Sequence, residues 1–218
     1  MIRLAIFDLD GTLIDTPNAI VSGFTDTLAA LGAAPRTPAE IRATVGLPLQ
    51  RAFETLLGPE GRHLVNDAAA HYLEIYRERI VPTAADLVFP GVAEGLARLA
   101  GQGVHLAVAT NKTTAGAELI LDSAGLLERF TQVYGADRVA KPKPDPEVCT
   151  TAVKAYGVLP HEAVMVGDTT HDLHAAEAAG IASIAVTYGV QSTEALLKAH
   201  PTWCADTFGQ VVSHILDP

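Results

Sequence analysis

Short apolar runs recur along the chain, and most are separated by segments whose apolar positions have a helical spacing. A short apolar run bounded by turn residues is typical of a buried strand. Such runs predict strands at Ile2–Phe7, Val104–Thr110, Val133–Gly135, Ala163–Gly167 and Ile181–Val186. The helical spacing predicts helices at Gly91–Ala100, Thr113–Ala124, Asp145–Tyr156 and Asp172–Ala179. Alternation of strand and helix indicates an α/β fold with a mostly parallel sheet.

A long interruption without a convincing strand, Thr16 to Asp86, separates the first two strands. Its prolines, glycines and apolar stripes predict helices at Pro17–Leu31, Pro38–Thr44, Leu49–Leu57 and Gly61–Arg79. About seventy helical residues exceed what one crossover connection needs. We therefore expect two units, a catalytic core of residues 1–15 and 87–218 and a helical cap of residues 16–86, hinged at Asp15–Pro17 and Ala85–Pro90. The tail from Thr202 to Pro218 is expected to add a last strand and helix.

The composition narrows the kinds of partner and compartment. The 218 residues are 49% hydrophobic, which suffices for a full core, and the formal charge of −10 argues against nucleic acid or an anionic membrane as a partner. The two cysteines, Cys149 and Cys204, are far apart and are expected to be free thiols. The N-terminal apolar segment leads directly into the Asp8 motif, so we expect a cytoplasmic protein rather than one with a cleaved leader.

Two acidic residues directly follow the first strand, at Asp8 and Asp10. Residues two apart on an extended chain point the same way, so both carboxylates can converge on one space. Two such charges repel each other unless a cation or a shared proton offsets them. Ligands of α/β sheets bind at the carboxyl ends of the strands, which is where these residues fall.

Further polar motifs follow later strands. Thr110 and Asn111 precede a helix, and a hydroxyl beside free backbone N–H groups suits an anion, although an ordinary helix cap has the same pattern. The loop Lys141-Pro-Lys-Pro-Asp-Pro146 is stiffened by alternate prolines. The fourth strand ends in Gly167-Asp168, and Asp172 begins the next helix, from which its side chain can return to the same cluster.

These four motifs, in this order, resemble the signature of the haloacid dehalogenase-like superfamily, whose members are mostly phosphatases. The helical insert after the first strand resembles the cap of the phosphoglycolate phosphatase and β-phosphoglucomutase-like branch. The resemblance implies a Rossmann-like core with an inserted all-helical cap. It also implies Mg²⁺ as cofactor, held by the Asp8 carboxylate, the Asp10 backbone carbonyl and the Asp168 carboxylate, while Asp172 orients a bound water.

The same resemblance assigns roles at the phosphate. Asp8 is the nucleophile that forms an aspartyl-phosphate, and Asp10 is the general acid and base. Thr110 holds the phosphoryl group with help from Asn111, and Lys141 contacts both the nucleophile and the phosphate. In this interpretation Lys143 points elsewhere.

Other polar residues have more than one reading. His171 and His174 are expected to have surface or packing roles rather than to bind metal. The stretch Thr44–Arg51 is the expected substrate-selecting loop of the cap, and Arg51 would either bind a substrate anion or lie in solvent.

The expected substrate is a small phosphorylated metabolite, with phosphoglycolate as the first candidate. A phosphomutase of the β-phosphoglucomutase type and a pyrophosphatase are the alternatives within the superfamily. A non-catalytic phosphate-binding module is disfavoured because pure binding has no need of Asp10. The presence of Asp10 and of a metal site disfavours dehalogenation, and the absence of lysine from Thr16–Asp86 disfavours phosphonate hydrolysis.

Overall fold

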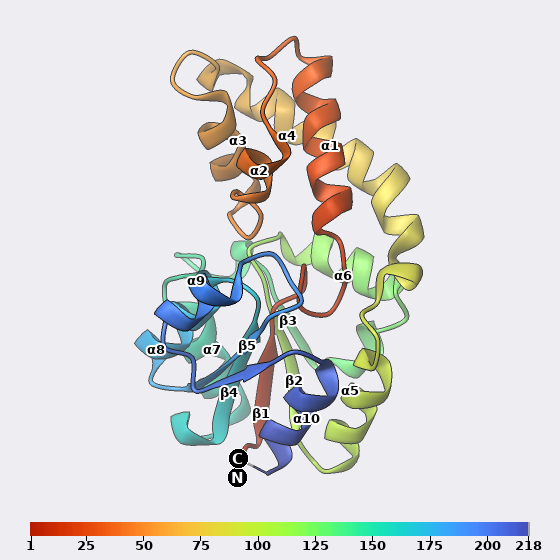
Figure 1. The fold of residues 1–218 in the computed structure, drawn as a ribbon. Helices are drawn as coiled ribbons and strands as arrows, with labels where there is room; N and C mark the ends of the chain where they lie inside the picture. The colour runs from red at the N-terminus through yellow and green to blue at the C-terminus, as the bar shows by residue number, and fades with distance from the viewer. Residues whose placement is uncertain (218) are drawn as a thin grey trace.

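The computed structural model describes residues 1–217, and its core is one sheet of six parallel strands (Figure 1). The strands lie in the order β3-β2-β1-β4-β5-β6, so β1 is central. Their bounds are Leu4–Phe7 for β1, His105–Ala109 for β2, Gln132–Tyr134 for β3, Ala163–Gly167 for β4, Ala182–Val186 for β5 and Trp203–Ala205 for β6. Each neighbouring pair in the sheet is parallel, which confirms the predicted α/β fold.

Helices cover both faces of the sheet. Their bounds are Val92–Gly101 for α5, Thr114–Ser123 for α6, Glu147–Tyr156 for α7, Thr170–Ala179 for α8, Thr193–Lys198 for α9 and Phe208–Leu216 for α10. Side chains of β1 alternate between two apolar clusters, because successive residues of a strand point to opposite faces. Ala5 and Phe7 join the cluster with α5, α6 and α10, whereas Leu4 and Ile6 join the one with α7 and α8.

The tail forms the predicted last strand and helix, β6 and α10, and Pro218 lies outside the described residues. Cys149 and Cys204 are both free thiols, as expected. None of the helices within residues 1–217 has the length and apolar character needed to cross a bilayer.

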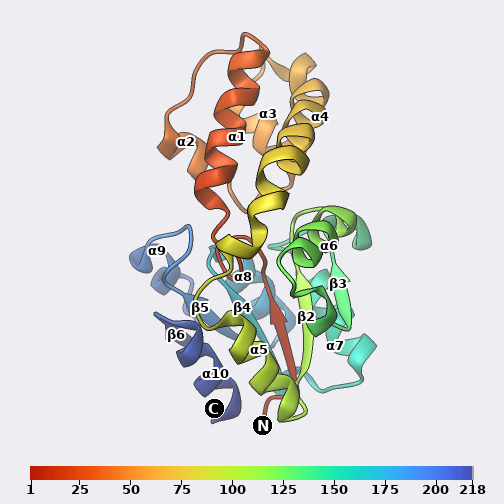
Figure 2. The ribbon, with the colours of Figure 1, turned by 90° about the vertical axis from the view of Figure 1, so that its right-hand side faces the viewer.

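The segment between β1 and β2 is helical up to α5, and its first helices stand beyond the carboxyl ends of the strands (Figures 1 and 2). It contains α1 at Pro17–Ala30, α2 at Pro38–Arg42, α3 at Leu49–Leu57 and α4 at Val65–Ile75. The predicted single helix over Gly61–Arg79 is divided: a 3₁₀ turn at Arg62–Leu64 precedes α4, a π-helical turn at Tyr76–Ile80 follows it, and a 3₁₀ segment at Val81–Leu87 leads back to the core.

Aromatic side chains hold the inserted helices together. Phe24 of α1 stacks on Phe53 of α3, and Tyr72 of α4 meets Phe24 edge to face, with both pairs of ring centroids 4.6 Å apart. All three rings are buried. Edge-to-face and offset-stacked pairs are favoured by the ring quadrupole, so this cluster fixes the three helices relative to one another. It is continuous with the apolar cluster on one face of the sheet, which ties the insert to the core.

Candidate active site

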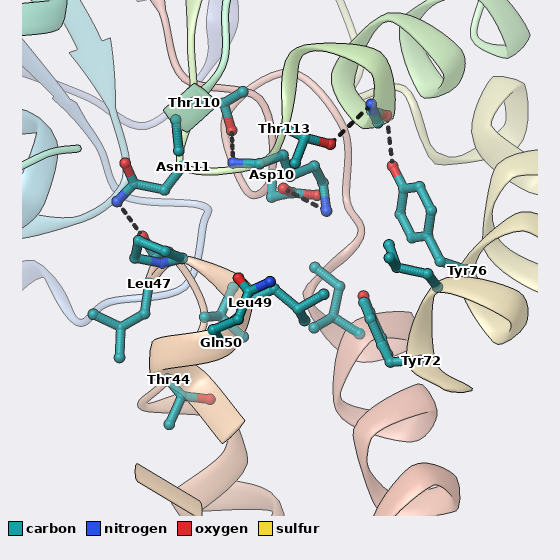
Figure 3. Close-up of a pocket in the computed structure, with 18 of the residues that line it drawn as sticks. Asp10, Thr44, Leu47, Leu49, Gln50, Tyr72, Tyr76, Thr110, Asn111 and Thr113 are labelled. Atoms are coloured by element: carbon teal, nitrogen blue, oxygen red, sulfur yellow. Dashed lines mark hydrogen bonds and ion pairs between the residues drawn. The ribbon is translucent and has the colours of Figure 1, made fainter. Parts of the chain in front are cut away.

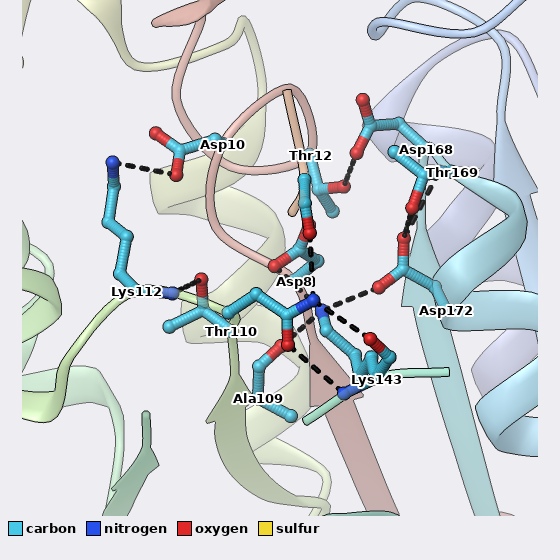
Figure 4. A network of polar contacts seen from close by, with 12 residues as sticks. Asp8, Asp10, Thr12, Ala109, Thr110, Lys112, Lys143, Asp168, Thr169 and Asp172 are labelled. Atoms are coloured by element: carbon cyan, nitrogen blue, oxygen red, sulfur yellow. Dashed lines mark hydrogen bonds and ion pairs between the residues drawn. The ribbon is translucent and has the colours of Figure 1, made fainter. Parts of the chain in front are cut away.

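The first strand delivers Asp8 to a buried position at its carboxyl end (Figure 4). Only 5% of Asp8 is exposed. The chain then turns at Gly11, whose φ of +78° favours glycine. A Cβ at Gly11 would lie 2.2 Å from Oδ2 of Asp168, so this turn must be glycine for the loop and Asp168 to pack together. Thr12, on the same loop, donates a hydrogen bond of 3.0 Å to Oδ1 of Asp168.

Lys143, and not Lys141, is the lysine that contacts the expected nucleophile. Lys143 Nζ lies 2.9 Å from Oδ1 of Asp8 and 2.6 Å from Oδ1 of Asp172, and its side chain is 3% exposed. It also donates a 2.7 Å hydrogen bond to the Ala109 carbonyl. The Lys141 side chain is 75% exposed and lies 3.8 Å from Asp145. The expectation that Lys141 reaches Asp8 while Lys143 points away is therefore wrong.

Hydrogen bonds with Asn111 hold the backbone of Lys143 in the position from which its side chain points inward. The Asn111 amide oxygen accepts a hydrogen bond from the Lys143 backbone N–H, and its Nδ2 donates to the Lys143 carbonyl, both at 3.0 Å. Nδ2 also donates to the Gly46 carbonyl of the insert at 2.7 Å. Asn111, expected to assist at the phosphate, thus has an amide fully engaged in fixing the Lys143 backbone and one loop of the insert.

Three buried carboxylates, those of Asp8, Asp168 and Asp172, each bring an oxygen within 4.8 Å of the others. Burial raises the pKa of Asp8 to about 7, against the lowering effect of Lys143. Burial also raises the pKa of Asp168 well above its usual range, and the charges of Asp8 and Asp172 add to this effect. Ionising these carboxylates is unfavourable because they are buried and because their negative charges repel one another. A hard divalent cation bound to their oxygens would offset both effects.

The three carboxylates are not equally free to bind a cation. Asp172 accepts from Lys143 at one oxygen and from the Thr169 hydroxyl, at 2.7 Å, at the other. Asp168 accepts from Thr12 and, at 2.7 Å, from the Val190 N–H, and an ionised carboxylate keeps further lone pairs. These contacts are compatible with the expectation that Asp8 and Asp168 bind the metal directly and that Asp172 orients a bound water. That assignment, and the Asp10 carbonyl as a ligand, stay predictions.

Asp10 turns its carboxylate away from the other acids (Figure 4). Its Oδ2 lies 3.0 Å from Lys112 Nζ, and its Oδ1 accepts a 2.5 Å hydrogen bond from the Thr16 hydroxyl. Lys112 also lies 4.6 Å from the centre of the Tyr76 ring. Sequence reasoning missed Lys112, and the one signal available was its place at the end of β2, directly after Thr110 and Asn111.

A cavity of about 160 Å³ opens beside Asp8 and Asp10, between the inserted helices and the core (Figure 3). Thr110, at the end of β2, lines it and is 4% exposed. Residues 44–50 line it from the insert, as expected for the selecting loop. Arg51 does not line it, because its side chain is 74% exposed and pairs with Glu54 at 2.9 Å. Of the two predictions for Arg51, a substrate contact or a side chain in solvent, this structure agrees with the second.

The histidines near the fourth motif, His171 and His174, are not part of the acid cluster of Asp8, Asp168 and Asp172. His174 is half exposed and lies 3.7 Å from Glu177. His171 is partly buried, its Nδ1 has no hydrogen-bond partner within residues 1–217, and burial lowers its pKa.

Comparison with known proteins assigns the family. The family model described as haloacid dehalogenase-like hydrolase matches residues 5–186. The chain is 49% identical over 210 residues to a Dickeya dadantii protein named "Probable phosphatase IndB", covering 96% of this chain and 91% of the relative. It is 31% identical to "Phosphoglycolate phosphatase 1" of Pseudomonas aeruginosa, covering 94% of this chain and 76% of the relative.

A solved haloacid dehalogenase-like family hydrolase from Streptococcus pneumoniae superposes with a TM-score of 0.83 at 27% identity, covering 98% of each chain. The fold, the order of the motifs and these matches agree with one another. The chain therefore belongs to the haloacid dehalogenase-like hydrolase family and is a phosphatase of that family.

Proposed function

We propose that the protein is a Mg²⁺-dependent phosphatase that hydrolyses a small phosphorylated metabolite through an aspartyl-phosphate on Asp8. The observation that carries the proposal is the convergence of Asp8, Lys143 and Asp168 at one point. Asp8 Oδ1 lies 2.9 Å from Lys143 Nζ, and Asp8 brings one carboxylate oxygen within 4.8 Å of one oxygen from each of Asp168 and Asp172. Phosphoryl transfer to a carboxylate requires a nucleophile and positive charge close to the phosphate. Asp8 would be the nucleophile, and the Lys143 ammonium and a metal ion at the carboxylate cluster would supply the charge.

Asp8 would attack phosphorus in line with the leaving oxygen, so that one P–O bond forms as the other breaks. Lys143 offsets the repulsion between the carboxylate and the phosphate oxygens, and it is charged at neutral pH. Burial acts to lower its pKa, but Asp172 and Asp8 outweigh burial and raise it. Thr110 would donate its hydroxyl to a phosphate oxygen. Mg²⁺, held by Asp8 and Asp168, would supply further positive charge to stabilise the transition state.

Asp10 would move the protons. Its carboxyl gives a proton to the leaving alcohol and then takes one from the water that hydrolyses the aspartyl-phosphate. Its carboxylate is placed for this role because it lines the cavity, where Lys112 and Thr16 hold it apart from the acid cluster. The products are the alcohol and inorganic phosphate.

Hydrolysis of para-nitrophenyl phosphate with Mg²⁺, with EDTA, and by Asp8→Asn tests the proposal. We expect release of nitrophenol only with metal and only with Asp8 intact. Activity retained by Asp8→Asn would exclude this nucleophile. Phosphoglycolate heads the substrates to screen, because relatives 31% identical to the chain carry that name.

A further inference from the structure

The wall that the inserted helices contribute to the active-site cavity is mostly apolar, with Thr44 and Gln50 as its polar members besides the tyrosine hydroxyls. It is built from α1, the loop between α2 and α3, and the end of α4, which brings together segments far apart in the sequence. The apolar and aromatic residues on this wall are Ile20, Phe24, Val45, Leu47, Leu49, Tyr72, Leu73 and Tyr76. A leaving group attached to a phosphate at Asp8 would project into this part of the cavity.

Positive charge is scarce on the same cavity. Among its lining residues, Lys112 is the one cationic side chain, and it is already paired with Asp10 at 3.0 Å and lies against the Tyr76 ring. Arg51, the nearest arginine along the selecting loop, faces solvent. A leaving group with its own carboxylate or second phosphate would be buried there without a free cation, and an unpaired buried charge is costly.

The shape of the wall adds a second constraint. The rings of Tyr72 and Tyr76 lie on one side of the cavity and Leu47 lies on the other, with Leu49 between them (Figure 3). The two tyrosine ring centroids are 6.1 Å apart, and the Tyr72 ring is fixed by its edge-to-face contact with Phe24. A flat apolar group between rigid rings and aliphatic side chains gains both buried area and aromatic contact.

We propose that the leaving group is an uncharged alcohol that carries an aromatic ring, so that the preferred substrates are phosphate monoesters with no second anion. The inference rests on the proposed phosphatase function and names its substrate class. It also predicts that phosphoglycolate, a small ester with a second anion, is a poor substrate in spite of the names of the 31%-identical relatives.

Four alkyl phosphates test the effect of an aromatic ring and the effect of a second anion independently, because all four are esters of the same chemical type. They are benzyl phosphate, 4-carboxybenzyl phosphate, ethyl phosphate and phosphoglycolate. We expect kcat/KM for benzyl phosphate to exceed each of the others by about tenfold or more, as ring contact and an unpaired buried charge require. A higher kcat/KM for phosphoglycolate or for 4-carboxybenzyl phosphate would overturn the inference while leaving the phosphatase function intact. If none of the four esters is hydrolysed by protein that hydrolyses para-nitrophenyl phosphate, the inference is overturned and the phosphatase function stands; if para-nitrophenyl phosphate is not hydrolysed either, both are overturned.

A charge placed on the apolar wall provides a gain-of-function test. Leu49→Arg should lower the ratio of kcat/KM for benzyl phosphate to that for 4-carboxybenzyl phosphate by about tenfold, because the new guanidinium can pair with the carboxylate. Leu119→Arg is the matched control, since Leu119 is 41% exposed on α6 and does not line the cavity. An equal change of ratio in both variants would refute the assignment of this wall to the leaving group. The wild-type comparison stands by itself if Leu49→Arg does not fold.

Discussion

The ammonium group of Lys143 lies 2.9 Å from the carboxylate of Asp8, with both side chains buried at the end of the central strand. This pair, rather than the more exposed Lys141, determines how the negative charge of the site is balanced. Asp172 holds the same ammonium at 2.6 Å, so the lysine is fixed from two sides. Burying three charged groups is favourable only while all of them are present.

Replacing Lys143 should therefore lower activity severely, whereas replacing Lys141 should not. We expect Lys143→Met to lower kcat for para-nitrophenyl phosphate by about 10²-fold to 10³-fold, the usual effect of losing a fixed donor at a charged transition state. It should also lower the free energy of unfolding by about 3–5 kcal/mol, because Asp8 and Asp172 lose their buried partner. Lys141→Met, the matched control, should change both quantities little, since its side chain is in solvent. The opposite ranking would return the role to Lys141.

The raised pKa values of Asp8 and Asp168 predict a pH dependence of stability in the metal-free protein. Both groups hold their protons more tightly when folded than when unfolded, so the folded state binds more protons between about pH 4, the usual range of an aspartate, and pH 7. Stability should therefore fall as pH rises through this window, by at most about 1.4 kcal/mol per pH unit for each group. Urea unfolding in EDTA at a series of pH values measures the slope.

Mg²⁺ should reverse this trend, because it binds the ionised carboxylates. The increase in unfolding temperature on adding Mg²⁺ is expected to grow from pH 5 to pH 8. Asp8→Asn is the control, since it removes one titrating group and should flatten the metal-free slope. A metal-free protein that becomes more stable between pH 5 and pH 7 would contradict the assignment.

The loop after β1 offers a test of the metal site that does not depend on activity. Gly11 and Gly103 have nearly the same φ, +78° and +79°, so alanine at either position incurs a similar backbone strain of about 1–2 kcal/mol. A Cβ at Gly103 meets nothing within 4 Å, whereas one at Gly11 meets Asp168 at 2.2 Å. Gly11→Ala should therefore lose the stabilisation by Mg²⁺, and Gly103→Ala should keep it. Equal responses to Mg²⁺ in calorimetry would argue that Asp168 is not a ligand.

The sequence predicts the fold well because the strands are short buried runs with polar residues at their ends. Such runs favour a parallel sheet that is covered by helices on both faces. In that sheet the carboxyl ends of the strands bring Asp8, Thr110 and Asp168 to the same edge. The boundaries within Gly61–Arg79 are predicted less well, because 3₁₀, α and π turns share nearly the same apolar spacing.

The choice between the two lysines depends on contacts that the local sequence does not reveal. Lys141 and Lys143 each precede a proline, so their local patterns are the same. What separates them is the Asn111 amide, which fixes the Lys143 backbone from 32 residues away. The pairing of Lys112 with Asp10 is of the same kind, since it joins the end of β2 to the loop after β1. Long-range polar contacts of this type are set by the packed fold and leave no periodic signal.

Lys112 should act through Asp10 rather than on the substrate directly. With Thr16, it holds the Asp10 carboxylate in one place, so Lys112→Met is expected to lower kcat by about tenfold to 10²-fold, part of the usual contribution of a general acid and base. Lys198→Met, at an exposed lysine paired with Glu194, is the control for the loss of one positive charge and should leave kcat unchanged.

A double-mutant cycle distinguishes positioning of Asp10 from an independent role. Residues that act as a unit have non-additive effects, so Asp10→Asn with Lys112→Met should be no slower than Asp10→Asn alone. If Lys112 instead contacted the phosphate, the two losses would multiply, and KM would rise in Lys112→Met while Asp10→Asn left it unchanged. Steady-state kinetics of the four proteins on para-nitrophenyl phosphate decide between these outcomes, because an effect transmitted through Asp10 disappears once the Asp10 carboxylate is gone.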